Sequence, residues 1–467
     1  MSIGGREGAS IDPSRRDALL AVLAPYESLV LAVSGGADSL ALMHLVAEWR
    51  AADSHRQRQV AVATVDHRLR EGSETEAARV KEMAAEIGFE HETLVWTGVK
   101  RQASIQRDAR EARYALLTGF AGNRAAPAAI VTAHTADDQA ETVLMRLARG
   151  SGLDGLAAMA LVRAAGPIAP AIDIVRPLLS VTRAELEAFL RARGVTWIDD
   201  PSNADPRFER VRLREARPAL DAIGLDVAPL TRTARRLGRA RSALEALTDD
   251  LASSVVETHG GAYASIRVPK FMAAPEELRL RLLARLLTAF GGVSSPPTMT
   301  ELEDLTGRLE KVPACRVTLG GCLIRACGHE VRIFRETGRL GLPSVQLSRG
   351  SVLIWDDRFR VAWPATESWS PASLEIRALA PKEAAGLRAA ARSLRSGRTR
   401  GWPMPARAAV TLPAIWEDGR LISVPGFVLL DEAGRPKGAP FGLKIAFCRN
   451  DIIFGAELEA SSAVKEP

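Results

Sequence analysis

The chain has 467 residues, more than one compact core accommodates, so two or three domains are expected. Its 47% apolar and 25% charged residues are ordinary for a soluble globular protein, and no stretch is long or apolar enough for a signal core or a membrane span. The four cysteines all lie beyond residue 314, which excludes a disulfide scaffold and favours a reducing, cytoplasmic location. The net charge of +6 permits a nucleic-acid partner without proving one.

Short apolar runs alternate with helical patterns through the first part of the chain. Strands are expected at 29–33, 60–65, 92–96 and 129–133, and helices at 39–50, 74–87, 106–121 and 137–149. This alternation predicts the α/β class, with a parallel sheet covered by helices. Ligands of such sheets bind beyond the carboxyl ends of the strands, where polar clusters fall at 34–39, 66–70 and 134–141. We therefore expect these three clusters to form one site.

The first cluster is a glycine turn between a strand and a helix. Its members are Ser34, Gly35, Gly36, Ala37, Asp38 and Ser39. Such a turn directs backbone N–H groups and a helix N-terminus at one point, which suits a phosphate group, and the two serines add hydroxyl donors. A carboxylate at position 38 fits only if it holds a Mg²⁺ ion that bridges to phosphate oxygens. A plain Gly-Gly turn is the alternative, and the serines with Asp38 argue against it.

The second cluster ends the second expected strand and is less specific. Asp66 at a strand end often only caps the following loop, and this interpretation is as good as a functional one. Beside a phosphate-binding turn, Asp66 or His67 could instead contact a nucleotide.

Arg110 and Arg113 share a face of the third expected helix. Either both are solvated, or Arg113 stabilises the charge that develops on a departing pyrophosphate.

The third cluster joins helix capping with charge. Thr135 is expected to cap a helix, and acidic residues are favourable in a first turn. Asp138 and Glu141 share a face of that helix, and His134 ends the strand before it. Two carboxylates on one face could bind a cationic amine or a metal, or accept a proton from an attacking amine. We favour the functional interpretation because the other two clusters are expected at the same edge.

Beyond residue 150 the pattern changes. A helix is expected from Thr182, with Glu185 in the capping-box position, to about Arg193. The stretch 219–290 is helical and rich in arginine, 317–335 indicates a β-hairpin around Gly320, and the remainder is a small mixed region. Two basic runs could follow a nucleic-acid backbone, or could be solvated faces. These are Arg207, Arg210, Arg212 and Arg214, and then Arg388, Arg392, Arg395, Arg398 and Arg400.

Taken in order, these motifs resemble the tRNA(Ile)-lysidine synthase family of the PP-loop ATP pyrophosphatase superfamily. The matching patterns are S-G-G-x-D-S, D-H-x-L-R, Q-x-x-A-R-x-x-R-Y and T-A-H-x-x-D-D-Q-x-E-T, followed by matches at 149–152, 176–179 and 200–203. Residues 29 to about 215 match densely, and the C-terminal part only loosely. Ser104 departs from the family, which usually has Asn two places before Gln106.

The resemblance implies a two-step reaction. ATP, with Mg²⁺ at Asp38, adenylates C2–O of the first anticodon cytidine of an isoleucine tRNA with a CAU anticodon, and pyrophosphate leaves. The ε-amine of free L-lysine then displaces AMP, which changes codon reading from AUG to AUA. The turn 34–39 would hold the phosphates, Arg113 would assist the departure of pyrophosphate, His134 would contact nucleotide or base, and Asp138 with Glu141 would receive lysine.

The resemblance also implies the domain plan and the partners. A catalytic PP-loop domain is expected at 1–217, a helical tRNA-binding domain at 218–340 and a C-terminal tRNA-recognition domain at 345–467. A homodimer is compatible with these expectations. The alternatives are a tRNA thiolase, which generally uses cysteines or an iron–sulfur cluster that residues 1–314 cannot provide, and a non-catalytic RNA-binding protein, which the intact Asp38, Arg113 and Asp138 disfavour.

Overall fold

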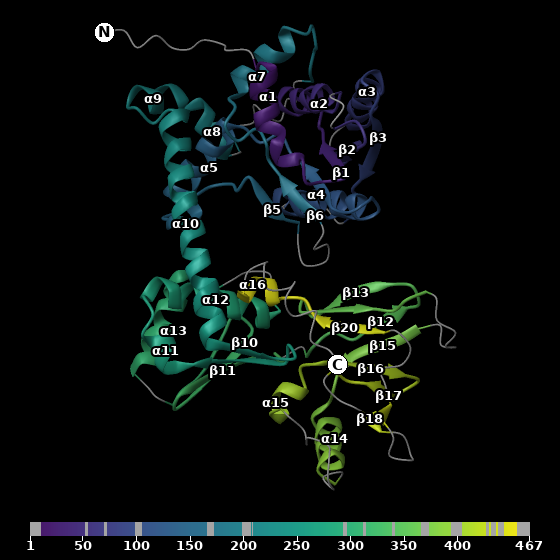
Figure 1. Cartoon of the computed structure of the whole chain (residues 1–467), viewed down its shortest axis with the longest axis vertical. Helices are drawn as coiled ribbons and strands as arrows, with labels where there is room; N and C mark the ends of the chain where they lie inside the picture. Colours follow the sequence, from purple (N-terminus) through teal and green to yellow (C-terminus); the bar gives the residue numbers. More distant parts are fainter. Residues whose placement is uncertain are drawn as a thin grey trace. The chain divides into compact units, whose positions relative to one another are not determined.

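The structure is a computed structural model of the chain, and it forms two compact units, residues 1–241 and 242–467 (Figure 1). It describes residues 11–51, 55–69, 72–98, 105–165, 172–198, 207, 209–292, 297–311, 314–338, 341–365, 373–393, 404–425, 429–430, 436–437 and 443–454. Several residues of the sequence motifs lie outside these ranges, among them Arg70, Ser104 and 200–203, and so do the side chains of the basic run at 388–400. None of the helices in the described ranges has both the length and the apolar character that a membrane crossing needs.

A six-stranded sheet forms the centre of the first unit, in the order β3-β2-β1-β4-β6-β5. The strands β1 (Ser28–Ala32), β2 (Gln59–Asp66), β3 (Glu90–Val95), β4 (Ala128–Val131) and β6 (Ile172–Val175) are parallel, and β5 (Val162–Ala164) joins β6 antiparallel. The parallel-sheet prediction and its four strands are confirmed. The strands β5 and β6 were not predicted.

Helices cover both faces of this sheet, because successive residues of the central strand β1 point to opposite sides. Leu29 and Leu31 pack with residues of α1, α2 and α7 on one face, whereas Val30 and Ala32 pack with residues of α4 on the other. The helices of this unit are α1 (Pro13–Leu20), α2 (Ala37–Arg50), α3 (Ser73–Glu86), α4 (Ile105–Gly122), α5 (Ala136–Ala148), α6 (Leu153–Leu156), α7 (Arg183–Arg191), α8 (Glu209–Glu215) and α9 (Arg217–Ala222), with a short 3₁₀ turn at Ala21–Leu23. The long helix α10 (Val227–Val255) contains the boundary between the units.

Two helix starts that matter for the site are fixed by capping boxes. Thr135 accepts from the backbone N–H of Asp138 at the start of α5, and the Asp138 carboxylate accepts from the backbone N–H of Thr135 in return. Thr182 and Glu185 do the same at the start of α7, as predicted. Each box satisfies backbone donors that a helix N-terminus otherwise leaves unpaired, and so fixes where α5 and α7 begin.

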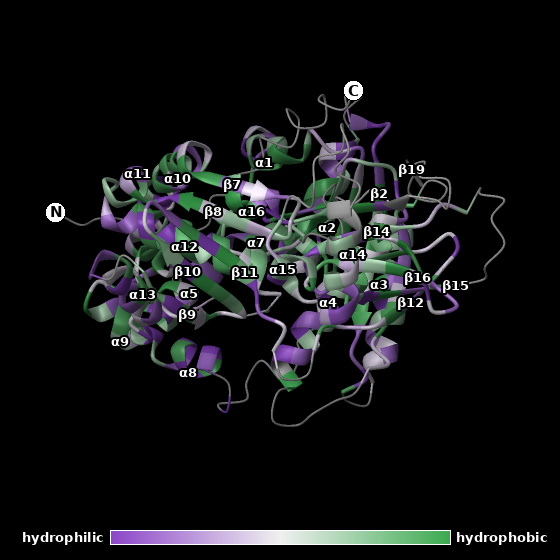
Figure 2. Ribbon diagram, turned by 90° about the horizontal axis from the view of Figure 1, so that it is seen from below, coloured by the Kyte–Doolittle hydropathy of each residue, from purple (hydrophilic) through white to green (hydrophobic). Residues whose placement is uncertain are grey.

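The second unit has an antiparallel sheet with a packed core on each face. Its order is β7 (Val256–His259), β8 (Tyr263–Arg267), β11 (Glu330–Arg335), β10 (Cys322–Cys327) and β9 (Arg316–Leu319), which confirms the predicted hairpin. Ile324 and Ile333 pack against a helical layer, whereas Leu323 and Phe334 face the C-terminal part. Figure 2 shows the helix α12 (Glu276–Gly291) of that layer beside β10 and β11. The helices of that layer are α11 (Val268–Met272), α12 (Glu276–Gly291) and α13 (Met299–Lys311).

The C-terminal part is mixed α+β, as predicted. One sheet has the order β12 (Val345–Ser348), β15 (Ser373–Ala378), β16 (Pro413–Glu417) and β17 (Arg420–Ser423), and another has β13 (Val352–Trp355), β14 (Phe359–Ala362) and β20 (Lys444–Phe447). The pair β18 (Leu429–Leu430) and β19 (Pro436–Lys437) and the helices α14 (Pro381–Ser393), α15 (Ala406–Ala409) and α16 (Asn450–Phe454) complete it. The three-domain division stays a prediction.

Candidate active site

A cavity of about 410 Å³ lies beyond the carboxyl ends of β1 and β4 in the first unit. It brings together the glycine turn, the start of α5 and one arginine of α4. The predicted residues that line it are Ser34, Gly36, Ala37, Asp38, Ser39, Arg113, His134 and Asp138. Arg183, Glu187, Trp197, Ile198 and Arg214 also line it, and of these only Arg214 was singled out from the sequence. Two of the three expected clusters therefore share one cavity.

The glycine turn is held in a shape that requires glycine at position 35. Gly35 has a φ of 90°, in the left-handed region, and Gly36 is the N-cap of α2. The Ser39 hydroxyl donates to the carbonyl of Gly36 at 2.9 Å, and the backbone N–H of Ser34 donates to the Ser39 hydroxyl oxygen at 3.2 Å. The N-terminus of α2 thus opens into the cavity, where its partial positive charge favours an anion.

Arg183 joins the two halves of the site. Its Nε donates to Asp38 Oδ2 at 3.1 Å, and its Nη2 lies 3.8 Å from Asp138 Oδ1. Its backbone N–H donates to the Asp137 carboxylate at 2.9 Å. Sequence reasoning missed Arg183 because it missed β6: this strand lies beside β4, so the chain that follows it returns over the same sheet edge.

Asp38 keeps one carboxylate oxygen for another ligand. Burial raises the pKa of Asp38, and the guanidinium of Arg183 acts against that increase. Its Oδ2 accepts from Arg183, whereas Oδ1 is buried and has no hydrogen-bond donor among the residues that the structure describes. A buried, unpaired carboxylate oxygen beside a phosphate-type turn fits a Mg²⁺ ligand. In the described part of the chain, no group of three or more His, Cys, Asp or Glu residues is arranged to hold a metal ion.

Asp138 and Glu141 differ in their surroundings although they share a face of α5. The Oδ2 atom of Asp138 accepts from the backbone N–H of Thr135, and its Oδ1 atom faces Arg183 at the cavity wall. Glu141 is 4% exposed, is not part of the wall, and forms an ion pair with Arg214 at 2.7 Å. Arg210 lies 3.9 Å from the same carboxylate. Two arginines of the first basic run therefore contact an internal acid.

His134 and Arg113 also line the cavity. Burial lowers the pKa of His134 to about 4, an effect that Asp138 opposes and nearby arginines reinforce, so the imidazole is neutral near pH 7. Its Nδ1 lies 2.9 Å from the Thr132 hydroxyl. Burial also lowers the pKa of Arg113, which nevertheless stays charged. The cavity thus presents a neutral imidazole beside a half-buried guanidinium.

Asp66 and His67 are not part of the cavity wall. Asp66 is buried and accepts from the backbone N–H of Arg68 at 2.8 Å, which is the loop-capping role that the sequence left open. His67 packs edge-on against Trp96, with 5.8 Å between ring centroids. A contact of either residue with a nucleotide stays a prediction.

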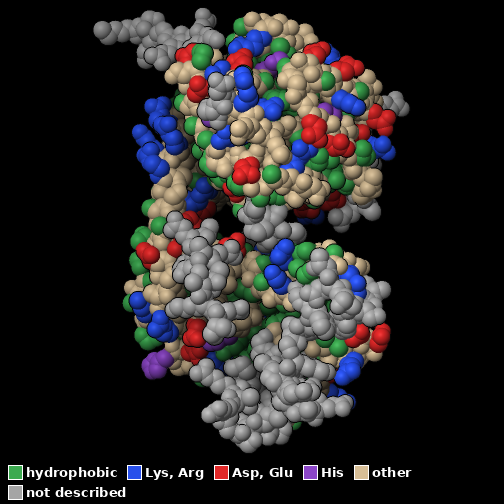
Figure 3. All heavy atoms as spheres, turned by 45° about the vertical axis from the view of Figure 1, so that its right-hand side comes forward, with side chains coloured by type: hydrophobic (Ala, Val, Ile, Leu, Met, Phe, Trp, Pro, Cys, Tyr) green, Lys and Arg blue, Asp and Glu red, His purple; other side chains and the backbone are tan. Residues whose placement is uncertain are grey.

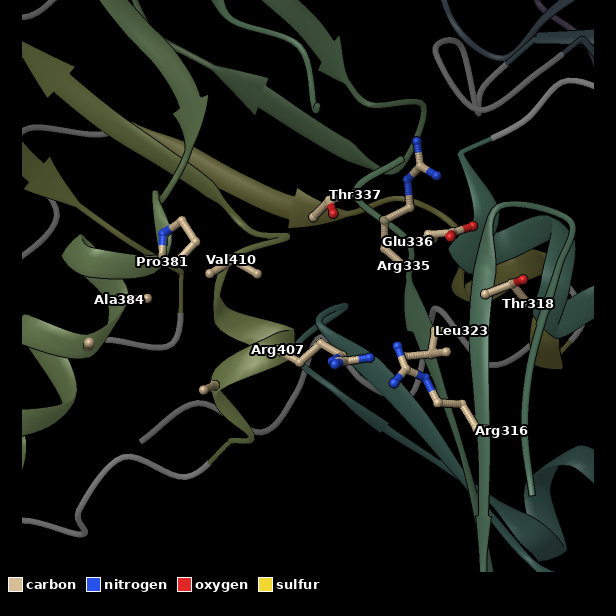
Figure 4. Close-up of a pocket in the computed structure, with 12 residues that line it drawn as sticks. Arg316, Thr318, Leu323, Arg335, Glu336, Thr337, Pro381, Ala384, Arg407 and Val410 are labelled. Atoms are coloured by element: carbon tan, nitrogen blue, oxygen red, sulfur yellow. The ribbon is translucent and has the colours of Figure 1, made fainter. Parts of the chain in front are cut away.

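A second cavity of about 560 Å³ lies in the second unit (Figure 4). Arg316 of β9 and Arg407 of α15 extend into it over Leu323, and both are exposed. Neither has an ion-pair partner within the described ranges, whereas Arg335 of the same wall forms a two-point pair with Asp356 at 2.8 and 2.9 Å. The cavity therefore offers two unpaired guanidinium groups beside an apolar floor.

Comparisons with known proteins identify the family of the chain. Residues 14–219 match the PP-loop domain family, which implies the use of ATP. A tRNA(Ile)-lysidine synthase of Ruegeria pomeroyi is 38% identical over 402 residues, which cover 86% of this chain and 89% of the relative. One of Bradyrhizobium sp. is 42% identical over 354 residues, covering 71% and 97%. The chain belongs to the tRNA(Ile)-lysidine synthase family.

Members of this family are ligases that form a carbon–nitrogen bond, and the fold and the family expected from the sequence are confirmed. A solved U34-tRNA thiolase from Methanococcus maripaludis also resembles the chain, with a TM-score of 0.37 and 15% identity over 46% of this chain and 71% of that one. This likeness is too low to indicate a function. The thiolase alternative is not favoured by the lysidine synthase relatives.

Proposed function

We propose that this protein adenylates the first anticodon cytidine of an isoleucine tRNA with a CAU anticodon and then joins L-lysine to it, forming lysidine. The observation that carries the proposal is the meeting of Asp38, Arg113 and Asp138 at one cavity, in a chain that matches lysidine synthases over most of its length. Such a cavity offers a turn that suits phosphate, a half-buried cation and a carboxylate for an amine. These are the groups that an adenylation followed by an amine attack requires.

The first step needs stabilisation of a leaving pyrophosphate. The N-terminus of α2 and the hydroxyl group of Ser34 would hold phosphate oxygens. The hydroxyl of Ser39 would join them by turning its hydrogen from the Gly36 carbonyl to a phosphate oxygen. Asp38 would hold Mg²⁺, which when bound neutralises phosphate charge. Arg113, which lines the cavity, would stabilise the negative charge that develops as the bond between the α- and β-phosphates breaks.

The second step needs a deprotonated amine at C2 of the cytidine. Asp138 would bind the ε-ammonium of lysine through Oδ1 and accept its proton. The amine then forms the C2–N bond while the C2–O bond breaks and AMP leaves. His134, as a neutral imidazole, would contact the activated base or the nucleotide without adding charge. Glu141 would act through Arg214, which lines the cavity.

Two surfaces could hold the rest of the tRNA. Arg232, Arg235, Arg236 and Arg239 recur at helical spacing on α10, and all four are exposed. Figure 3 shows basic side chains gathered over this helix. In the second unit, Arg316 and Arg407 are free to contact phosphates. We propose that both surfaces bind the tRNA backbone, and that the C-terminal part helps to select the tRNA.

A single incubation tests the reaction. The full chain is mixed with an isoleucine tRNA transcript carrying CAU, ATP, Mg²⁺ and labelled lysine, and the same transcript with a UAU anticodon is the control. Lysine incorporated into the CAU transcript alone, with one AMP and one pyrophosphate per lysine, is the expected result. Pyrophosphate release without lysine transfer, or transfer to both transcripts, would contradict the proposal.

A further inference from the structure

Arg183 occupies the position that a bound cation would take in this cavity. Its guanidinium lies between Asp38, 3.1 Å away on α2, and Asp138, 3.8 Å away on α5. The two carboxylates are 21% and 11% exposed, and the Arg183 side chain is 30% exposed. In the ligand-free protein this one side chain therefore offsets the charge of two poorly hydrated carboxylates.

Asp138 has only one oxygen left for a cation. Its Oδ2 accepts from the backbone N–H of Thr135 at 2.9 Å and from the Thr135 hydroxyl at 3.1 Å, so it is committed to the capping box. The other oxygen, Oδ1, is the one that Arg183 approaches. A lysine ammonium that binds Asp138 must therefore compete directly with this guanidinium.

The backbone of Arg183 is held by hydrogen bonds, whereas its guanidinium is partly exposed to the cavity. Its N–H is held by Asp137, and it is the first residue of a helix with a capping box. The guanidinium is partly exposed at the wall of the same cavity as the phosphate turn. Phosphate oxygens bound at that turn carry more charge than the Asp138 carboxylate and suit the two-point geometry of a guanidinium.

We propose that Arg183 couples the binding of the two small substrates: nucleotide phosphates draw its guanidinium away from Asp138, and Asp138 Oδ1 then accepts the lysine ammonium. This inference rests on the proposed function for the identity of ATP and lysine. Arg183 is thus a positioning residue that favours binding of ATP before lysine. The coupling is reciprocal, so lysine strengthens nucleotide binding by the same factor.

Calorimetry on the full chain tests this coupling. The dissociation constant of lysine is measured with and without a saturating non-hydrolysable ATP analogue and Mg²⁺. In the wild type the analogue is expected to tighten lysine binding by about tenfold or more, within the usual range of coupling between sites. In Arg183→Gln, the affinity for lysine without the analogue should rise towards the affinity that the wild type shows with the analogue. The coupling ratio, which is the lysine dissociation constant without the analogue divided by that with it, should therefore fall to about one.

The ratio separates coupling from a simple charge effect. Removing a positive charge alone would tighten lysine binding by the same factor in both states and leave the ratio unchanged. Arg183→Lys, which keeps the charge, should restore part of the ratio. Arg193→Gln is the matched control, because Arg193 is 32% exposed and pairs with Glu48 at 2.7 Å, and its ratio should equal that of the wild type.

Two results overturn the inference. The first is a coupling ratio in Arg183→Gln equal to that of the wild type. The second is that, without the analogue, Arg183→Gln binds lysine no more tightly than the wild type does. In both cases the melting temperature must show that the variant is folded. If either result is obtained and the wild-type protein forms lysidine, only the coupling role of Arg183 is refuted. If the wild-type protein neither binds lysine nor forms lysidine, the proposed function is refuted as well.

Discussion

A Cβ atom at Gly35 would lie 2.7 Å from Cδ1 of Ile198, closer than packed carbon atoms approach. The two residues are also joined by a hydrogen bond, from the N–H of Ile198 to the carbonyl of Gly35, at 2.9 Å. Ile198 therefore packs against the glycine turn, and its side chain would have to shift to admit a Cβ atom at position 35. Gly36, its neighbour, has no such contact, because a Cβ atom at that position would be 3.9 Å from its nearest neighbour, the hydroxyl oxygen of Ser34.

Gly35→Ala should impair the turn, whereas Gly36→Ala should be tolerated. Alanine at position 35 meets both a left-handed φ of 90° and Ile198, which together cost about 2–4 kcal/mol. We expect ATP-analogue affinity to fall by about tenfold or more and the melting temperature to fall by several degrees. Gly36→Ala should keep the melting temperature near that of the wild type, because a Cβ atom there meets no protein atom closer than 3.9 Å. Equal losses of melting temperature in the two variants would show that the turn is not shaped as described.

Asp138→Asn separates charge from capping. The asparagine oxygen can still accept from Thr135, so the start of α5 is kept, but the negative charge that would bind an ammonium is lost. Lysine affinity should fall by about tenfold or more while pyrophosphate release continues, since a hydrogen bond to a charged group contributes about 1.5–3 kcal/mol. Asp138→Ala should also lose about 1 kcal/mol of stability with the cap. Lysine transfer near the wild-type rate in Asp138→Asn would remove this residue from the lysine site.

The sequence predicted the central sheet well because its strands are apolar runs between clear turn residues. The expected strand 60–65 lies within β2 (Gln59–Asp66), and the expected helix 74–87 corresponds to α3 (Ser73–Glu86). The strand β6 has only four residues, which is too short for periodicity to decide although three of them are β-branched, and β5 is exposed along its length. Pairing within the sheet is what defines both as strands.

The sequence did not predict two ion pairs of the site, those of Arg183 and Arg214. Arg183 contacts Asp38 across 145 residues, and only the placement of β6 beside β4 brings them together. Arg214 contacts Glu141 across 73 residues, from a basic run that the sequence associated with tRNA. Local motifs therefore located the turn and the carboxylates, whereas the arginines that neutralise them depend on contacts distant in sequence.

Glutamine in place of the four exposed arginines of α10 should weaken tRNA binding and make it less dependent on salt. The residues replaced are Arg232, Arg235, Arg236 and Arg239. Each phosphate contact contributes about 0.7–0.9 to the slope of log affinity against log salt, so four lost contacts lower it by about 3. Filter binding at several salt concentrations measures this slope. Arg124→Gln is the control, because Arg124 pairs with Glu90 at 2.9 Å, and it should leave the slope unchanged. An unchanged slope in the fourfold variant would mean that α10 does not touch the tRNA.

The cavity of the second unit should matter for whole tRNA but not for its anticodon arm. Arg316→Gln with Arg407→Gln removes the two unpaired guanidinium groups, and affinity for full-length tRNA should fall by about three- to tenfold. Affinity for an isolated anticodon stem-loop should not change. Arg332→Gln, whose arginine pairs with Glu330 at 2.6 Å, serves as the control. Equal losses with both RNAs would argue against a role of this cavity in recognising the body of the tRNA.

His134 should make the protein less stable as the pH falls below neutrality. Its pKa in the folded protein is about 4, below the ordinary value of 6.5, so between these values the unfolded chain binds a proton that the folded protein does not. The free energy of unfolding therefore falls as the pH falls from 6.5 to 4, and His134 contributes nothing above this window. At pH 5 the loss is about 2 kcal/mol.

Urea unfolding of the wild type and of His134→Gln at pH 7 and pH 5 measures this contribution. The variant has no titrating group at this position, so its loss of stability between the two pH values should be smaller by about 2 kcal/mol. The imidazole resonance of His134 should titrate with a midpoint near 4. A midpoint near 6.5, or the same loss in both proteins, would show that the imidazole is hydrated and that the wall formed with Arg113 is open to water.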